Sequence, residues 1–217
     1  MQRRDFSLQL AAAGLGLGLA GGARAQAVAP VEGQHYVRLA TPVAVALPAA
    51  DKKIEVVEFF WYGCPHCFAF EPVLDNWTRK LPADVAFRRV PVGFAVPHQL
   101  HQRVYYALEE MGVLAAQHRR IFTAIHQQNV RLNTEAEIVA YMKGNGVDAA
   151  RFTEALKSFG VSGKAAKARA LSEAYKIDGV PALGIHGRFY TSASLSGSHE
   201  NTVAVADVLI QRARKPT

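Results

Sequence analysis

The two cysteines of this 217-residue chain lie three positions apart, in the segment Cys64-Pro65-His66-Cys67. A disulfide between them would close a very short loop, so it would restrict the unfolded chain little and contribute little stability. Two thiols at this spacing can share one face of a helix and pass between dithiol and disulfide forms. The spacing therefore favours a redox site over a structural crosslink.

The neighbours of the two cysteines predict thiols of unequal reactivity. Cys64 is expected where a strand ends and a helix begins, among unpaired N–H groups at the positive end of the helix dipole. Pro65 suits the first helical turn, because its missing N–H costs nothing there, and His66 adds a charge or a donor. Cys64 is thus the predicted attacking sulfur and Cys67 the resolving one. A strongly acidic Cys64 would make the disulfide an oxidant.

The elements that must hold this motif follow an α/β pattern. Residues 53–62 are rich in Val, Ile and aromatic side chains, which is typical of a strand buried on both faces. A helix over residues 64–81 and a second strand over residues 84–94 follow. A strand, a helix and a strand in this order predict a right-handed parallel unit.

A helical insertion separates this unit from a second β-rich part. Residues 98–175 contain five segments with apolar residues at helical spacing, which predicts five short helices. Strands return over residues 179–191, with a hairpin turn at His186-Gly187, and a last amphipathic helix is predicted over residues 201–214. The predicted division is a sheet-containing domain of residues 26–97 and 176–217, interrupted by an all-helical insertion of residues 98–175.

The first 25 residues predict an export signal. Arg3 and Arg4 give a charged start, an Ala/Leu/Gly-rich stretch follows, and Ala23-Arg24-Ala25 places small residues at a cleavage site. The Arg pair followed by Phe6 resembles a twin-arginine signal, with ordinary Sec export as the alternative. A buried N-terminal helix is the remaining interpretation, and the many glycines disfavour it. Export would place the mature chain in the oxidising bacterial periplasm.

Composition narrows the classes of partner. The chain carries a formal net charge of +7, and loss of the signal removes three arginines and one aspartate, which leaves +5. The remaining basic residues are dispersed along predicted helices, as on a solvated surface rather than a nucleic-acid footprint. No later stretch reaches the roughly 18 uninterrupted apolar residues of a membrane span. We therefore expect a soluble mature chain with no nucleic-acid partner.

Two segments together resemble a known family. Residues 58–67 (EFFWYGCPHC), followed after the insertion by residues 179–183 (GVPAL), are similar to the DsbA family of periplasmic thiol:disulfide oxidoreductases. The resemblance covers nearly the whole mature chain in element order, and it implies an α/β thioredoxin fold with an inserted all-helical subdomain. The implied enzyme is a dithiol oxidase that donates its Cys64–Cys67 disulfide through a mixed disulfide at Cys64.

The resemblance also implies the partners of the site. Substrates would be unfolded exported proteins with free cysteines, and a DsbB-like membrane quinone reductase would reoxidise the enzyme. The redox-active Cys64–Cys67 disulfide would carry the reaction without a cofactor or a metal ion. The chain would act as a monomer. Val180-Pro181 would form a cis-proline loop facing the disulfide. Because Pro181 offers no N–H, the backbone of Val180 would be free to pair with an extended substrate.

Glu58 interrupts an otherwise apolar strand, where a carboxylate is costly unless it is paired or functional. By resemblance, Glu58 is the buried acid behind the active site and helps to move the proton of Cys67. Arg89 on the neighbouring strand is its expected partner. The family often has a lysine there, and arginine shares a proton less readily. A purely structural ion pair is the alternative.

Other functions could use the same cysteines. A metal-binding or metallochaperone module would use Cys64, Cys67 and His66, with His98 and His101 on one helical face, although structural zinc sites usually pair two such clusters. A peptide-binding chaperone would use the same groove without turnover. Reductases of this fold typically carry Gly-Pro between the cysteines, and isomerases need a dimerisation domain.

His118 and His126, in the predicted helices, are taken as surface or capping residues. The aromatic residues beside the motif are expected to lie mostly in the core, with Tyr62 or Phe68 as the candidates to edge the substrate groove; they are Phe59, Trp61, Tyr62 and Phe68.

Overall fold

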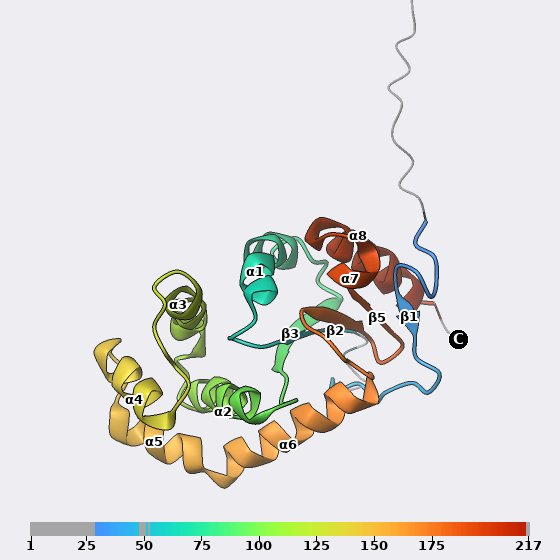
Figure 1. Cartoon of the computed structure of the whole chain (residues 1–217). Helices are drawn as coiled ribbons and strands as arrows, with labels where there is room; N and C mark the ends of the chain where they lie inside the picture. The colour runs from blue at the N-terminus through green and yellow to red at the C-terminus, as the bar shows by residue number, and fades with distance from the viewer. Residues whose placement is uncertain (1–28, 48–50, 52, 216–217) are drawn as a thin grey trace, which may run out of the picture.

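The sheet at the centre of the molecule joins segments from both ends of the chain (Figure 1). The computed structural model describes residues 29–47, 51 and 53–215, so the predicted signal of residues 1–25 lies outside the described residues. Within these residues, five strands pair in the order β1-β5-β4-β2-β3. The strands are β1 (Val37–Arg38), β2 (Ile54–Phe60), β3 (Val85–Pro91), β4 (Ala182–Ile185) and β5 (Phe189–Ser192).

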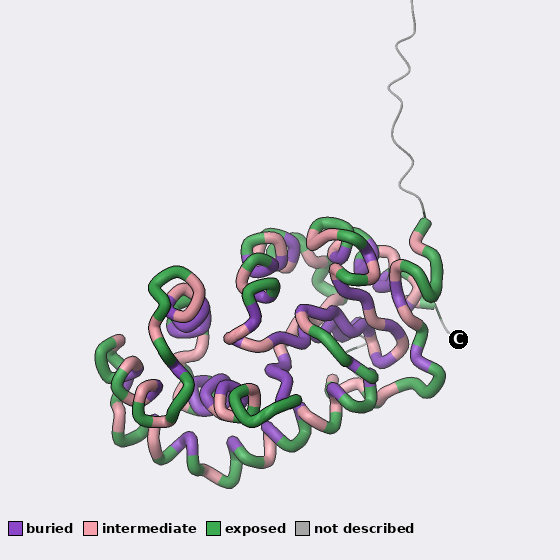
Figure 2. The backbone as a smooth tube through the Cα atoms, in the orientation of Figure 1, coloured by how far each residue is buried: buried purple, intermediate pink, exposed green. Residues whose placement is uncertain are grey.

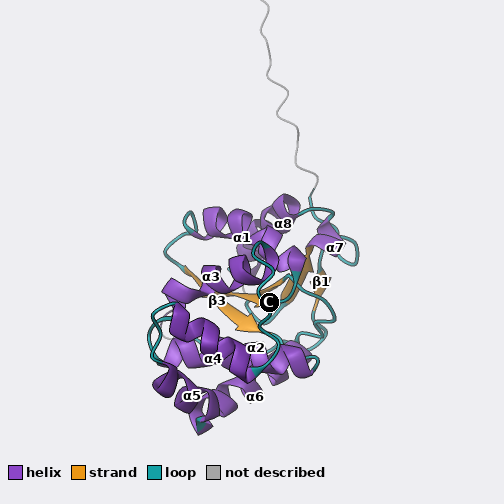
Figure 3. Ribbon diagram, turned by 60° about the vertical axis from the view of Figure 1, so that its left-hand side comes forward, coloured by secondary structure: helices purple, strands orange, loops and turns teal. Residues whose placement is uncertain are grey.

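Helices cover both faces of this sheet. The described residues form α1 (Pro65–Thr78), α2 (Val96–Glu110), α3 (Leu114–His126), α4 (Glu135–Gly144), α5 (Ala149–Lys157), α6 (Phe159–Ala174), α7 (Ala193–Ser196) and α8 (His199–Ala213). Figure 3 shows α1 and α8 on one side of the sheet and α2, α5 and α6 on the other. None of the helices in residues 29–47, 51 and 53–215 has both the length and the apolar character needed to cross a bilayer.

The order of elements confirms the predicted fold class, a thioredoxin fold with an all-helical insertion. Strand β2 runs parallel to β3, and β4 pairs antiparallel with β2 on the other side. Five helices of the described chain, α2 to α6, lie between β3 and β4. The domain limits at residues 97/98 and 175/176 stay a prediction. The sequence analysis missed β1 and α7, because neither is long enough to show a periodic pattern.

Strand β2 is buried along its whole length, as Figure 2 shows for the centre of the sheet. Up to Phe59 its side chains alternate between two apolar cores: Val56 belongs to the core under α1 and α8, while Val57 and Phe59 belong to the core that includes the inserted helices. Since Glu58 has the same parity as Val56, its carboxylate is directed to the side of the sheet that α1 covers. The strand thus aims a charged group at the back of the helix that carries both cysteines.

The hairpin between β4 and β5 brings the second predicted site segment to the sheet. His186 and Gly187 both have left-handed backbones, with φ of 50° and 66°, as a two-residue hairpin turn of this kind requires. At Gly187 a Cβ atom would overlap the carbonyl of Val43. The position therefore requires glycine for two reasons, the left-handed backbone and the lack of space for a side chain. The predicted turn is confirmed, and β4 runs back beside β2 from Val180-Pro181.

Candidate active site

Cys64 is the N-cap residue of α1, in an extended conformation with φ −86° and ψ 115°. Its Sγ accepts a hydrogen bond from the backbone N–H of Cys67 at 3.2 Å, which is the bond that a capping oxygen makes in other helices. Pro65 takes the first helical turn, and the exposed His66 follows it. Both cysteines are free thiols. The helix start therefore presents backbone N–H groups to the sulfur of Cys64.

A tight turn leads from β2 into this helix. The N–H of Cys64 donates to the carbonyl oxygen of Trp61 at 3.0 Å. A Cβ atom at Gly63 would overlap the indole ring of Trp61, so the turn accommodates only glycine at that position. The indole is held in turn by the imidazole of His98, whose ring centroid lies 4.1 Å away. The position of Cys64 is thus fixed by packing as well as by the helix.

The two thiols have opposite electrostatic environments. Hydrogen bonding from the Cys67 thiol lowers the pKa of Cys64 to about 6, and the N–H groups of Cys67 and His66 act in the same direction against the opposing effect of burial. Burial raises the pKa of Cys67 well above that of a free thiol, since its side chain is 0% exposed. At neutral pH the structure therefore holds a thiolate at Cys64 and a thiol at Cys67.

The Val180–Pro181 loop faces the motif, and its peptide bond is cis, as predicted. In its protonated form, the thiol of Cys64 donates to the carbonyl oxygen of Val180 at 3.4 Å. This contact joins residues that are 116 positions apart in the sequence. A pocket of about 380 Å³ opens beside this contact; its lining includes His66, Val180, Pro181, Tyr190, Ser194 and His199. The sequence-predicted residues Cys64, His66, Val180 and Pro181 therefore meet at one surface.

Glu58 lies behind the motif with a side chain that is 0% exposed. Its Oε2 accepts a hydrogen bond from Nε of Arg89 at 2.9 Å, so the predicted ion pair is confirmed. The other oxygen, Oε1, has no hydrogen-bond partner among the described residues. Burial raises the pKa of Glu58 to about 8 even though Arg89 opposes the shift. The acid is consequently able to hold a proton at neutral pH.

Arg89 also contacts two acids on α1 that the sequence analysis missed. Its Nη2 lies 3.2 Å from Glu71 and 3.4 Å from Asp75. Glu71 is buried, and burial alone would raise its pKa, but the contacts with His118 and Arg89 outweigh burial and lower it. A signal was present: Glu71 follows Cys67 by four residues and so shares its helix face. One guanidinium therefore faces three carboxylates.

Two histidines of α3 correct the sequence-based interpretation. His118 is only 7% exposed, and its Nδ1 lies 2.9 Å from the hydroxyl of Tyr62. His126 is half-buried, and its Nε2 donates to the carbonyl oxygen of Tyr62 at 2.8 Å. The prediction of surface or capping residues was wrong because α3 packs its apolar face, which includes His118, against the motif. Tyr62 is itself buried and does not edge the groove, whereas Phe68 is half-exposed.

The histidines considered for a metal site serve other contacts. His101 is buried, with Nε2 at 2.6 Å from the carbonyl oxygen of Leu132, and His98 packs on Trp61. Across the part of the chain that the structure describes, no three side chains of the His, Cys, Asp and Glu types are arranged to hold a metal ion.

Comparisons with known proteins identify the family. The model of the DSBA-like thioredoxin domain matches residues 55–201. The thiol:disulfide interchange protein DsbA of Azotobacter vinelandii is 43% identical over 196 residues, which cover 89% of this chain and 90% of that protein. The DsbA of Pseudomonas aeruginosa is 42% identical over 193 residues, with the same shares. Its crystal structure has a TM-score of 0.79 to this chain at 42% identity, covering 84% of this chain and 93% of the other.

These relatives support disulfide exchange and neither of the alternatives, a metal-binding module or a chaperone without turnover. The relatives and the paired cysteines at the start of α1 agree on one chemistry. The chain therefore belongs to the DsbA-like thioredoxin domain family and is a protein thiol:disulfide oxidoreductase.

Proposed function

We propose that this protein is a dithiol oxidase of the bacterial periplasm that introduces disulfides into exported proteins. The observation that carries the proposal is the opposite shift of the two thiols, with the pKa of Cys64 at about 6 and that of Cys67 raised. A thiolate that is stable at Cys64 is a good leaving group and stabilises the reduced enzyme. Electrons should therefore flow from substrate dithiols to the enzyme disulfide.

The reaction has two exchange steps. A substrate thiolate first attacks Sγ of Cys64 in the enzyme disulfide; the bond to Cys67 breaks, and a mixed disulfide forms at Cys64. A second substrate thiolate then attacks the substrate sulfur of that mixed disulfide, and Cys64 leaves as a thiolate. The substrate loses two electrons and gains a disulfide, and the enzyme ends as a dithiol.

The buried side of the motif has to manage one proton in the first step. Cys67 leaves as a thiolate in surroundings that favour the thiol, because burial raises its pKa. Glu58 is the proposed proton donor: burial raises its pKa to about 8, so the acid form is present at neutral pH. Its unpartnered Oε1 is available for this role within the described structure. Arg89 would then stabilise the carboxylate that remains.

The peptide around the substrate cysteine is proposed to bind along the Val180–Pro181 loop. The carbonyl of Val180 faces Cys64, and an extended peptide could pair with this backbone by strand addition. His66 and Tyr190 line the adjoining pocket. Such main-chain recognition accepts many sequences, as a catalyst for many exported proteins requires.

The compartment and the second partner follow from the same chemistry. The predicted signal of residues 1–25 would deliver a monomer to the periplasm. Each turnover leaves two electrons on Cys64 and Cys67, so an acceptor must remove them. We assign this task to a DsbB-like membrane quinone reductase, and no further cofactor is needed in this chain.

A thiolate titration of the reduced mature protein tests the proposal. Absorbance near 240 nm should rise with a midpoint at about pH 6, and equilibration with glutathione should leave the protein mostly reduced. In the Cys64→Ser variant, which keeps Cys67, the step near pH 6 should be absent. A midpoint near the value of about 8.5 for a free thiol would overturn the assignment as an oxidase.

A further inference from the structure

Helix α3 of the inserted subdomain holds the turn before Cys64 at two points. The Tyr62 hydroxyl lies 2.9 Å from Nδ1 of His118, and the Tyr62 carbonyl accepts from Nε2 of His126 at 2.8 Å. Tyr62 lies inside the turn that the hydrogen bond from Cys64 to Trp61 closes. Its side chain is buried, and among the described residues no other hydrogen bond reaches its hydroxyl or carbonyl.

The proton positions on both imidazoles follow from their partners. A carbonyl oxygen only accepts, so Nε2 of His126 must carry hydrogen. Nε2 of His118 lies 3.5 Å from a carboxylate oxygen of Glu71, which also only accepts. Burial lowers the pKa of His118, which favours the neutral ring. A hydrogen on Nε2, the nitrogen nearer Glu71, leaves Nδ1 to accept from the Tyr62 hydroxyl. Each contact therefore has a defined direction.

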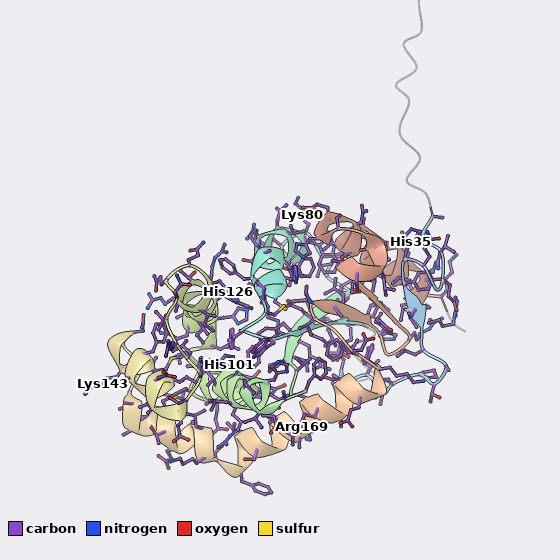
Figure 4. The ribbon with its side chains drawn as sticks, in the orientation of Figure 1. His35, Lys80, His101, His126, Lys143 and Arg169 are labelled. Atoms are coloured by element: carbon purple, nitrogen blue, oxygen red, sulfur yellow. The ribbon has the colours of Figure 1, made fainter. Side chains whose placement is uncertain are left out.

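The same two histidines also reach α1 on the far side of the cysteines. His118 faces Glu71, and the ring of His126 stacks on Phe68 with centroids 5.2 Å apart and planes 16° apart. Figure 4 shows His126 on α3 beside α1. Each histidine thus contacts one residue before Cys64 and one residue after Cys67.

We propose that His118 and His126 are positioning residues for the redox motif. By fixing the Tyr62 turn against the first turns of α1, they keep Sγ of Cys64 at the N–H groups that stabilise its thiolate. Without the histidines, the buried hydroxyl and the buried carbonyl of Tyr62 lose their hydrogen-bond partners, and the turn must move to reach water. The proposal rests on the disulfide exchange of the family and is independent of the direction of electron flow proposed above.

A purely structural role makes a different prediction. Side chains that only fill the core would change the stability of the protein when replaced, but the thiolate pKa of the folded protein would stay constant. The discriminating readouts are therefore the pKa of Cys64 and the glutathione equilibrium, each measured under conditions where circular dichroism shows the variant to be folded.

Two substitutions of His126 separate its donor from its ring. His126→Phe keeps a ring against Phe68 and removes the hydrogen bond to Tyr62, whereas His126→Gln keeps a donor and removes the ring. We expect His126→Phe to raise the pKa of Cys64 by about half a unit to one unit, so that the acid dissociation constant of the thiol falls about three- to tenfold. The glutathione equilibrium should shift toward the disulfide by the same factor. His126→Gln should stay close to the unmodified protein.

A double-mutant cycle tests His118 in the same way. Tyr62→Phe removes one oxygen atom and keeps the ring, so this variant should fold even if His118→Phe does not. Each substitution should raise the pKa of Cys64, and the double variant should show no larger shift than the greater single one, because both remove one hydrogen bond. His35→Phe is the control, since Figure 4 shows His35 beside β1 and away from α3.

Two results would overturn the proposal. The first is a Cys64 pKa that equals that of the unmodified protein in Tyr62→Phe and in both His126 variants. The second is a Cys64 pKa that shifts equally in His126→Gln and His126→Phe, because this result would exclude the hydrogen bond as the cause. These failures differ from failure of the proposed oxidase function. That function depends on the titration midpoint of the unmodified protein, whereas the positioning role depends on differences among variants.

Discussion

The two ends of the Cys64–Cys67 motif are one helical turn apart and have opposite surroundings. At the Cys64 end, the residue is 7% exposed, and its sulfur accepts hydrogen bonds from backbone N–H groups and faces the Val180 carbonyl beside a pocket. At the Cys67 end, the sulfur is fully buried on the side where Glu58 and Arg89 form their ion pair. Two chemically identical thiols thus receive pKa shifts of opposite sign. The reactivity of Cys64 is therefore set by hydrogen bonds from the Cys67 thiol and the backbone, and that of Cys67 by burial.

Removing each sulfur in turn should give the largest difference between the two ends. Cys64→Ser should abolish disulfide transfer completely, because the sulfur that the substrate attacks is gone. Cys67→Ser should instead keep a reactive Cys64 and accumulate mixed disulfides with substrate. Mass spectrometry of the trapped species measures both outcomes. If the Cys64→Ser variant formed mixed disulfides through Cys67 equally well, the assignment of Cys64 as the sulfur that reacts with substrate would be wrong.

The charged cluster behind Cys67 should respond next most strongly. Arg89→Met leaves the ionised Glu71 buried without its cation and Glu58 without its hydrogen-bond donor, which should cost about 3–5 kcal/mol of unfolding free energy. The loss should shrink at acid pH, where the carboxylates are protonated. Arg119→Met is the matched control, since Arg119 forms an ion pair with Asp75 from a side chain that is 62% exposed. The expected cost is about 0–1 kcal/mol of unfolding free energy. Equal costs in urea unfolding at pH 7 would contradict the assignment of Arg89.

The low pKa at the Cys64 end also predicts a pH dependence of stability. The folded pKa of about 6 is below the unfolded value of about 8.5, so the thiolate stabilises the folded dithiol form at high pH. This contribution is fully present near pH 8.5 and is lost as the pH falls through 6. The oxidised protein has no such group. Urea midpoints of the two forms should therefore diverge as pH rises from 6 to 8, and a constant difference over this range would refute the shift.

The side chain of His66 should have the smallest effect. A positive charge on the imidazole would act on Cys64 from an exposed position, where solvent screens it. His66→Gln should raise the pKa of Cys64 by about half a unit at most, because the backbone N–H groups remain. His66→Lys restores a positive charge and should reverse the rise in the same 240 nm titration. An effect of several units in His66→Gln would show that the imidazole outweighs the helix terminus.

Much of the Cys64 end could be predicted from sequence because its causes are local. A strand, a capping position and a proline in the first turn occupy consecutive residues, so the pattern of types alone places the sulfur. The Glu58–Arg89 pair also followed from two adjacent strands. The partners of Arg89 on α1 depend on how a helix lies over a sheet, and Glu71 and Asp75 carry no local mark of that packing.

The contacts of α3 were harder to predict. His118 and His126 meet Tyr62 from 56 and 64 residues away, and a polar residue on a helix is first assigned to the solvent side. A partial signal exists: His118 is spaced three, four and seven residues from Ile121, Phe122 and Ile125, so it shares their apolar face. That spacing indicates burial, but which group the imidazole meets depends on tertiary packing.

The close approach of the Trp61 indole to Gly63 makes these two positions depend on each other. A side chain at 63 fits only after the indole has moved or become smaller, while a smaller residue at 61 leaves the glycine tolerated but no longer required. Substitutions here consequently have an order, with position 61 changing first. In evolution or in a mutagenesis library, such a turn therefore accepts a substitution at position 63 only after one at position 61.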